Sequence, residues 1–488
     1  MADVRNQIRF ILNDRDVVLT DAAPSDTLLD YLRLNQRLRG TKEGCAEGDC
    51  GACTVLIGRL AGQGIVYETV NACIRFVGSL DACHIVTVEH LAGGDGKLHP
   101  VQQALVDQHG SQCGFCTPGF VMSLYGLWMR SPDPDVGEIE QALQGNLCRC
   151  TGYEPIIKAA QAVSEYGSPD QDPLNTERAD IVARLASLQD GSRIEIARDG
   201  ERLIVPADAD DLAAVLLEHP EATIVAGSTD VGLWVTKFMQ AISPAVFIGH
   251  LTELHRIEEG DDGVMIGACV TYSEFEGVVG NRYPQMREFW SRIGGEQVRN
   301  MGTVGGNIAN GSPIGDTPPA LIALGATVTL RRGDERRRVL LEDFFIEYGK
   351  QDRQPGDFVE SIHIPDPAPD DHFAVYKISK RRDEDISSVC GAFRLQLDDG
   401  MVTDAIIAFG GMAATPKRGK AAEAALVGKA WTETAAADAQ AALAKDFSPI
   451  SDWRASAEYR ALVAGNLLRR FYLETAGQIV RLAREQVA

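Results

Sequence analysis

Long apolar runs and a surplus of basic residues are both missing from this sequence. No apolar run approaches the roughly 18 residues that a membrane-spanning helix requires, so the sequence predicts no membrane insertion. Lys and Arg number 47 against 69 Asp and Glu, and the net charge of −22 argues against nucleic acid or an anionic membrane as a partner. The same charge is compatible with simple solubility. Six charged residues interrupt residues 1–18, so we expect no secretory signal there.

Two common nucleotide-binding fingerprints are also missing. No G-x-G-x-x-G turn occurs anywhere, which counts against a Rossmann dinucleotide fold. The glycine turn at 227–232 lacks the following Lys-Ser or Lys-Thr pair of a Walker loop. What remains is an ordinary globular composition, 45% hydrophobic and 24% charged over 488 residues, which is enough for several domains.

Eight of the 11 cysteines fall into two groups of four. The first group has the spacing C-x4-C-x2-C…C of plant-type [2Fe–2S] ligation, and the second combines C-x2-C with C-x-C. Zinc and unligated buried cysteines are the alternatives, but zinc sites prefer paired C-x2-C knuckles or added histidines. The sequence therefore predicts two [2Fe–2S] clusters in tandem and a reducing compartment, the cytoplasm. The predicted ligands are Cys45, Cys50, Cys53 and Cys73 for the first cluster, and Cys113, Cys116, Cys148 and Cys150 for the second. The lone Cys83 is interpreted as a core residue.

The region before residue 90 reads as β-rich with one helix. Ile8–Leu12 and Val17–Leu19 flank a polar turn and predict a hairpin. Ser25 or Asp26 is the expected helix cap, and residues 54–57 and 86–88 are expected strands.

After Pro100 the pattern changes to four short helices. Pro100 and Thr117-Pro118 mark two helix starts. Asp135 and Glu138 form a predicted capping box, and Thr151 precedes the fourth helix. The second cysteine group lies in the loops between these helices.

Residues 167–191 are interpreted as a linker, and the stretch beyond it contains two glycine loops. Thr223–Ala226 reads as a buried strand, and Gly227–Gly232 after it can offer backbone N–H groups to a phosphate. A second loop, Thr303–Asn307, precedes Asp316. Each loop alone is typical of a turn. Two such loops, followed by acidic residues that can bind ribose hydroxyls, favour a nucleotide-binding site. Further on, residues 373–378 are an expected strand, and Ala-rich stretches at 421–426, 435–444 and 457–483 are expected helices.

Three motifs resemble a known family. G-T-K-E-G-C-A-E-G-D-C-G-A-C-T-V at 40–55, Q-C-G-F-C-T-P-G-F at 112–120 and Q-G-N-L-C-R-C-T-G-Y at 144–153 resemble the iron–sulfur part of the molybdenum hydroxylases. More narrowly, nearly all 488 residues are similar to small subunits of the bacterial xanthine dehydrogenase family, which fuse iron–sulfur and flavin domains.

The resemblance implies an α+β multidomain fold. Its parts are a plant-ferredoxin-like β-grasp at 1–90, a four-helix [2Fe–2S] domain at 91–166, the linker at 167–191, an α+β FAD-binding domain of the PCMH/vanillyl-alcohol-oxidase type at 192–370, and an α+β C-terminal domain like that of CO dehydrogenase flavoproteins at 371–488. By the same resemblance, Gln112 and Cys150 lie closest to a pterin on a separate large subunit.

The resemblance also implies the flavin contacts. Asp316 is expected at the ribose or adenine side, and Val359 and Lys377 beside the flavin. Ile293 stands where several relatives place an aromatic residue beside the isoalloxazine. The residues expected to cradle the pyrophosphate are Thr223, Ile224, Val225, Ala226, Gly227, Ser228, Thr229, Asp230, Thr303, Val304, Gly305, Gly306 and Asn307.

The function implied is electron transfer in an oxidoreductase. Electrons from a molybdenum cofactor on a large partner, in an α2β2 heterotetramer, would pass through the second and then the first cluster to FAD and on to NAD, with xanthine and hypoxanthine oxidised to urate. The run 380–385 is a solvated loop by default, but in the family it adjoins the NAD side, where Arg381, Arg382 and Glu384 are candidates. Another hydroxylase, for aldehydes, nicotinate or another N-heterocycle, and a stand-alone carrier stay open as alternatives, since the sequence does not fix the substrate or the choice between NAD and oxygen.

Overall fold

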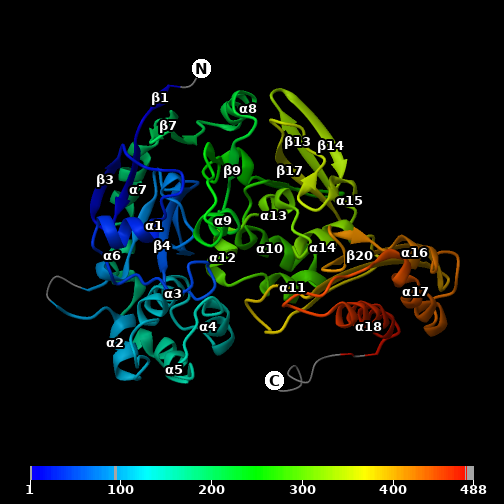
Figure 1. The fold of residues 1–488 in the computed structure, drawn as a ribbon. Helices are drawn as coiled ribbons and strands as arrows, with labels where there is room; N and C mark the ends of the chain where they lie inside the picture. The colour runs from blue at the N-terminus through cyan, green and yellow to red at the C-terminus, as the bar shows by residue number, and fades with distance from the viewer. Residues whose placement is uncertain (1–2, 93–95, 479, 481–488) are drawn as a thin grey trace. The chain divides into compact units, whose positions relative to one another are not determined.

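The chain is α+β throughout and forms two compact units (Figure 1). A computed structural model describes residues 3–92, 96–478 and 480. The first unit runs to Glu253 and includes Thr271–Glu274 and Gly294–Thr303. The second unit comprises Leu254–Val270, Phe275–Ile293 and the residues from Val304 onward.

A five-stranded sheet opens the first unit, in the order β3-β2-β6-β4-β5. The predicted hairpin is confirmed, because β2 and β3 pair antiparallel across Asn13, which has a left-handed φ of 54°. β6 pairs parallel with β2, which gives the β-grasp arrangement. The strands are β2 (Ile8–Leu12), β3 (Arg15–Leu19), β4 (Thr54–Ala61), β5 (Gly64–Asn71) and β6 (His84–Val86).

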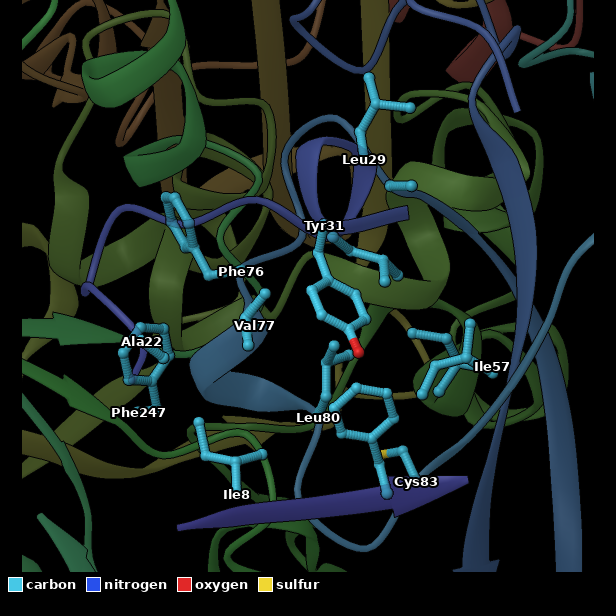
Figure 2. Close-up of a cluster of buried hydrophobic side chains, with 14 of the residues drawn as sticks. Ile8, Ala22, Leu29, Tyr31, Ile57, Phe76, Val77, Leu80, Cys83 and Phe247 are labelled. Carbon is cyan, nitrogen blue, oxygen red and sulfur yellow. The ribbon is translucent and has the colours of Figure 1, made fainter. Parts of the chain in front are cut away.

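The helical segment after β3 packs against this sheet, and its Leu28, Leu29 and Leu32 lie in one core with residues of β2. Ile8, Tyr31, Ile57, Phe76 and other buried side chains form the core shown in Figure 2. Cys83 lies in the same core, as predicted.

Two local predictions in this region are wrong. The cap of α1 (Leu28–Asp30) is Thr27, whose hydroxyl accepts from the backbone N–H of Asp30, while the Asp26 carboxylate binds the N–H of Ala23 and Arg198. The helix continues as a π-helical turn, η1 (Tyr31–Asn35). The expected strand at 86–88 ends at Val86, and Val88 starts a 3₁₀ turn, η3 (Val88–His90).

Four helices follow, as predicted: α2 (Pro100–Asp107), α3 (Thr117–Arg130), α4 (Val136–Ala142) and α5 (Glu154–Ala162). Both expected proline starts are present, at α2 and α3. The capping box is also confirmed, since Asp135 accepts from the N–H of Glu138 at 2.8 Å and donates its own N–H to Glu138 at 2.9 Å. The helices share a core with Ile11 and Leu56 of the first sheet.

The segment interpreted as a linker is more ordered than its composition indicated. It contains a 3₁₀ turn, η5 (Pro169–Gln171), and the helices α6 (Pro173–Thr176) and α7 (Arg178–Leu188). α7 buries Ile181 and Leu185 in the core of the helical domain, and its Arg184 pairs with Asp16 at 2.7 Å.

A second sheet completes the first unit, in the order β1-β7-β8-β10-β9. β1 joins it from the start of the chain, pairing parallel with β7. The strands are β1 (Val4–Arg5), β7 (Arg193–Arg198), β8 (Glu201–Val205), β9 (Thr223–Val225) and β10 (Ala245–Phe247), and the helices are α8 (Ala209–Glu218), α9 (Val231–Thr236) and α12 (Glu296–Met301).

The second unit contains an antiparallel sheet in the order β11-β12-β17-β13-β14. Its strands are β11 (Ile257–Gly260), β12 (Gly263–Gly267), β13 (Thr327–Arg332), β14 (Glu335–Leu340) and β17 (Phe358–Pro365), and a small pair, β15 (Phe345–Glu347) and β16 (Lys350–Gln351), lies apart from it. The helices here are α10 (Tyr272–Arg282), whose first three residues belong to the first unit, α11 (Arg287–Ser291), α13 (Val304–Asn310), α14 (Thr317–Ala323) and α15 (Leu341–Phe344).

A four-stranded antiparallel sheet with helices packed on it ends the chain (Figure 1). The expected strand at 373–378 and the three expected helices are present, although the last helix stops at Thr475, and residues 479 and 481–483 lie outside the described part. The elements are β18 (His372–Ile378), β19 (Val389–Asp398), β20 (Met401–Gly410), β21 (Lys417–Arg418), α16 (Lys420–Ala424), α17 (Glu433–Asp446) and α18 (Ala457–Thr475). Among the described residues, no helix has the length and apolar character needed to span a bilayer.

Candidate electron-transfer site

The first cysteine group converges on one loop. The backbone N–H groups of Cys50 and Glu47 point at the sulfur of Cys45, at 3.3 Å and 3.5 Å. Cys45 also contacts the thiols of Cys50 and Cys73, and Cys53 contacts Cys73. The loop turns through Gly48 and Gly51, whose φ values of 80° and 66° suit glycine. Four sulfurs and several inward N–H groups thus share one small volume.

Two of these thiols are biased toward the thiolate. Hydrogen bonds from Cys50 and Cys73 hold the pKa of Cys45 far below its ordinary value. A hydrogen bond from Cys73 lowers the pKa of Cys53, although burial opposes it. The same hydrogen bonds with Cys45 raise the pKa of Cys50 and of Cys73. Thiolates are the metal-binding form of cysteine, so a bound cluster would have to displace the protons that these two thiols retain.

The second cysteine group lies nearer the surface. Cys113 and Cys150 are exposed and contact each other, while the half-buried Cys116 and Cys148 form a second pair. Burial raises the pKa of Cys148, but the Thr151 hydroxyl, 3.2 Å from its sulfur, and backbone N–H groups outweigh it, so that pKa is lowered.

The thiols of each cysteine group contact one another in pairs. A [2Fe–2S] cluster shares four cysteines between two irons, and this arrangement is compatible with such a cluster. Among the described residues, no group of three or more His, Cys, Asp and Glu side chains is arranged as a preformed metal site.

The two cysteine loops touch through their backbones. The N–H of Leu147 donates to the carbonyl of Cys50 at 3.0 Å, and the amide of Asn146 donates to the carbonyl of Gly51 at 3.2 Å. A Cβ added to Gly119 on α3 would lie 2.1 Å from the Gly51 carbonyl oxygen, so only glycine permits this approach.

The first glycine loop joins β9 to α9 within the first unit. A Cβ at Gly227 would lie 1.6 Å from the carbonyl oxygen of Met301, so this backbone packs directly against the end of α12. Ser228 has a left-handed φ of 59°, and its buried hydroxyl donates to the carbonyl of Ile74 at 2.7 Å. Ile74 follows the predicted ligand Cys73.

The other end of α9 meets the first cysteine loop. The hydroxyl of Thr236 donates to the carbonyl of Ala46 at 2.7 Å, and the ammonium of Lys237 donates to the carbonyl of Cys45. One short helix therefore connects the first glycine loop with the first cysteine loop.

The second glycine loop contains an unsatisfied polar atom that fits a cofactor. Thr303 belongs to the first unit, while Val304 opens α13 in the second and donates its N–H to the carbonyl of Val270 at 3.0 Å. A Cβ at Gly305 would lie 2.5 Å from the carbonyl oxygen of Ala268. The side-chain oxygen of Asn307 is buried and has no hydrogen-bond partner among the described residues. Buried acceptors are nearly always satisfied, so a donor from a bound molecule fits there.

Asp316 and Lys377 form a buried ion pair in the second unit. The second carboxylate oxygen of Asp316 accepts from the hydroxyl of Ser387 at 2.5 Å. A carboxylate has about four lone-pair sites, so capacity for a ribose hydroxyl remains. Val359 on β17 and Ile293 after α11 are both buried.

The charged run at 380–385 is only partly solvated. Arg381 and Arg382 are exposed, but Glu384 is buried. Arg381 donates to the carbonyl of Glu384 at 2.5 Å, and Arg292 donates to the carbonyl of Arg382 at 2.9 Å. The interpretation as a wholly solvated loop is therefore wrong at Glu384.

Sequence reasoning missed four buried polar residues beside the cysteines and the ion pair. Asn146 stands inside the quoted motif before Cys148, which was a usable signal, and Ser387 lies just after the charged run. Ser123 and Gln297 carried no local signal, because their partners are far away in the sequence.

Four family profiles match the chain in succession. They are "2Fe-2S iron-sulfur cluster binding domain" at residues 10–76, "[2Fe-2S] binding domain" at 87–161, "FAD binding domain in molybdopterin dehydrogenase" at 197–367 and "CO dehydrogenase flavoprotein C-terminal domain" at 374–475.

Full-length relatives are larger proteins. Xanthine dehydrogenase/oxidase of Rattus norvegicus is 33% identical over 99% of this chain and 40% of its own length. Xanthine dehydrogenase of Emericella nidulans is 31% identical over 97% of this chain and 39% of its own length. The chain thus spans about two fifths of the curated relatives it matches.

Solved structures match about half of the chain. A Cu,Mo-CO dehydrogenase chain superposes with a TM-score of 0.52 and 30% identity, covering 55% of this chain and 94% of that one. A chain of quinoline 2-oxidoreductase from Pseudomonas putida 86 gives a TM-score of 0.51 and 27% identity, covering 56% and 95%. With four such profiles in succession and 30% identity over 94% of a CO dehydrogenase chain, the chain belongs to the molybdenum hydroxylase family, as an iron–sulfur and FAD electron-transfer module.

Proposed function

We propose that this chain is the electron-transfer subunit of a cytoplasmic xanthine dehydrogenase. It would accept electrons from a molybdenum cofactor on a large partner subunit, in an α2β2 heterotetramer, and deliver them to NAD. The observation that carries the proposal is the alignment of 99% of the chain with two fifths of a xanthine dehydrogenase/oxidase. A partner chain would supply the remaining portion.

The burial of the two cysteine groups supports a direction of flow. Cys113 and Cys150 are exposed beside the exposed Gln112 and Phe115, which suits entry of electrons from a docked partner. Cys53 and Cys73 are buried, and their loop contacts the first glycine loop through Ile74 and α9, which suits exit toward the flavin.

The chain's own residues hold and orient the carriers. The eight cysteines would bind two [2Fe–2S] clusters, and backbone N–H groups such as those of Cys50 and Glu47 would stabilise the sulfur charge. The glycine loops, with Asn307 and Asp316, would bind the FAD. When bound, FAD accepts electrons singly and releases them as a pair, which the reduction of NAD requires.

The exposed arginines are the proposed contact for NAD. The guanidinium of Arg382 is 46% exposed and lies 3.6 Å from the Glu288 carboxylate, so it can turn to an incoming diphosphate. Arg381 is tied to the loop backbone and would hold that loop in place.

A second candidate is the same subunit in a hydroxylase for another substrate. The solved relatives include a CO dehydrogenase and a quinoline 2-oxidoreductase, and aldehydes and nicotinate belong to the same chemical range. A stand-alone iron–sulfur flavoprotein carrier is the third possibility.

Affinity purification of the tagged chain from its own cells tests the proposal. We expect a large molybdenum-containing chain to co-purify, and anaerobic xanthine to bleach the cluster and flavin absorbance until NAD restores it. Bleaching by quinoline or an aldehyde but not by xanthine would support the second candidate. Purification of the cofactor-loaded chain alone would support the third.

A further inference from the structure

Gln297 lies on α12, a helix that carries no cysteine, yet its side chain reaches both cysteine regions. The side chain is buried, at 1% exposure. Its amide nitrogen lies 3.1 Å from the hydroxyl of Thr54, 3.1 Å from that of Ser123 and 2.9 Å from the side-chain oxygen of Asn146. Thr54 follows Cys53, Ser123 is on α3 after Cys116, and Asn146 precedes Cys148 by two positions. All of these residues belong to the first unit.

The partners of Gln297 have no hydrogen atoms left to give it. Thr54 donates its hydroxyl proton to the carbonyl of Gly51 at 2.6 Å, and Ser123 donates its own to Asn146 at 2.7 Å. A hydroxyl has one proton, so both hydroxyls offer only lone pairs to Gln297. The Gln297 amide is therefore the donor in this buried network, and its two hydrogens are shared among the three acceptors.

The backbone around the Gln297 side chain is closely packed. A Cβ at Gly145 would lie 1.9 Å from the side-chain oxygen of Gln297, and a Cβ at Gly51 would lie 2.0 Å from the carbonyl oxygen of Gly145. Gln297, Gly145 and Gly51 are thus stacked in direct contact, and Gly51 lies between Cys50 and Cys53. Any displacement of the Gln297 side chain would reach the first cysteine loop.

The helix that presents Gln297 is itself anchored. The Glu296 carboxylate pairs with the Arg130 guanidinium through bonds of 2.8 Å and 2.6 Å. Asn300, one turn further, donates to the carbonyl of Thr69 at 2.9 Å. Arg130 ends α3 and Thr69 lies on β5, so α12 is attached to both cysteine-bearing domains.

We propose that Gln297 is a positioning residue that fixes the spacing between the two clusters. The inference rests on the proposed function in one respect, the presence of a [2Fe–2S] cluster in each cysteine group. The rate of electron tunnelling falls steeply with distance. A network that fixes the distance between the two cysteine loops therefore also fixes the rate of electron transfer between their clusters. Gln297 acts through Thr54, Ser123 and Asn146, none of which is a predicted cluster ligand.

The test is electron paramagnetic resonance of the full chain with its cofactors, chemically reduced and frozen. Two reduced clusters interact magnetically, and the splitting falls with the cube of their separation. In Gln297→Leu, which keeps the volume and removes the donor, we expect that splitting to become smaller and broader, with the iron content and the g-values of each cluster unchanged. Gln103→Leu on α2, where the side chain bonds only to Asp107, is the matched control and should leave the splitting intact.

Ser123→Ala provides a second variant that keeps the bond from Gln297 to Thr54. Ser123→Ala should reduce the splitting by a smaller amount than Gln297→Leu. If Gln297→Leu loses iron, the splitting of Ser123→Ala is the result that tests the proposal. The proposal is overturned if a variant retains its full iron content and its splitting is unchanged. If the unmodified chain itself shows fewer than two [2Fe–2S] signals, the proposed function fails instead.

Discussion

Leu147 donates its backbone N–H to the carbonyl oxygen of Cys50 at 3.0 Å. Because Leu147 immediately precedes Cys148, this hydrogen bond joins the two cysteine loops, beside the bond from the Asn146 amide to the Gly51 carbonyl. The bond uses backbone atoms only, so the identity of the partly exposed Leu147 side chain is not what forms it. The two cysteine motifs, which are far apart in the sequence, are therefore in direct contact in the fold.

Cys148→Ser should remove one cluster and leave the other. We expect iron to fall by about half, since two clusters of equal iron content are predicted, and one of two paramagnetic signals to disappear on reduction. Cys83→Ser is the control, because Cys83 is buried in the core with its sulfur near the carbonyls of Ser79 and Asp81. Loss of iron in the control, or none in Cys148→Ser, contradicts the ligand assignment.

Gly119→Ala should destabilise the contact between the cysteine-bearing domains. The added Cβ would meet the Gly51 carbonyl oxygen at 2.1 Å, and overpacking of this kind costs about 1–3 kcal/mol. Thermal unfolding should show a lower midpoint and earlier loss of cluster absorbance. Gly277→Ala on α10 has open space around its Cβ and should be neutral or slightly stabilising. Equal unfolding midpoints in the two variants would show that the contact between Gly119 and the Gly51 carbonyl has room for a methyl group.

His84 should make the stability of the first unit depend on pH. Its Nε2 lies 2.8 Å from the carbonyl of Asn13 and its Nδ1 lies 2.7 Å from the hydroxyl of Tyr67, so the neutral ring donates from Nε2 and accepts at Nδ1. Burial lowers the pKa of His84 from 6.5 to about 4. As pH falls below 6.5, the unfolded chain binds a proton that the folded chain does not, so the free energy of unfolding decreases until the pH reaches the folded pKa.

Unfolding measured at about pH 7.5 and about pH 5.5 checks this dependence, with about 1.4 kcal/mol of stability lost through His84 over the interval. His84→Gln cannot titrate and should lose less over the same interval. Identical pH dependence in both chains would assign the effect to other groups.

Arg382→Ala should weaken NAD binding without slowing the earlier steps. An exposed ion pair such as Arg382–Glu288 contributes about 1 kcal/mol or less, so its loss should not disturb the fold, whereas arginine–phosphate bonds are stronger. Rapid mixing with substrate, then with NAD, should give an unchanged first half-reaction and a several-fold higher KM for NAD. Arg338→Ala, at an exposed position on β14, is the control. A slower first half-reaction with normal NAD kinetics would exclude this loop as the NAD site.

Local chemistry was predictable from the sequence, and long-range contacts were not. The capping box of Asp135 and Glu138, the proline at α2 and the cysteine spacings all depend on neighbours within a few residues. Thr27 displaced Asp26 as a cap because Asp26 is drawn to Arg198, which is 172 positions away. Gln297 escaped prediction for the same reason, since its partner Asn146 is 151 positions away. The ion pair of Asp316 with Lys377 was not predicted, because no local pattern relates the two residues and the resemblance placed them at different parts of the FAD.

Metal and sulfide analysis of the purified chain, combined with paramagnetic resonance after reduction, tests the central claim most directly. The account predicts about four iron and about four acid-labile sulfide per chain, two of each for every [2Fe–2S] cluster, and two distinct signals. Zinc in place of iron, without visible absorbance or acid-labile sulfide, would contradict it.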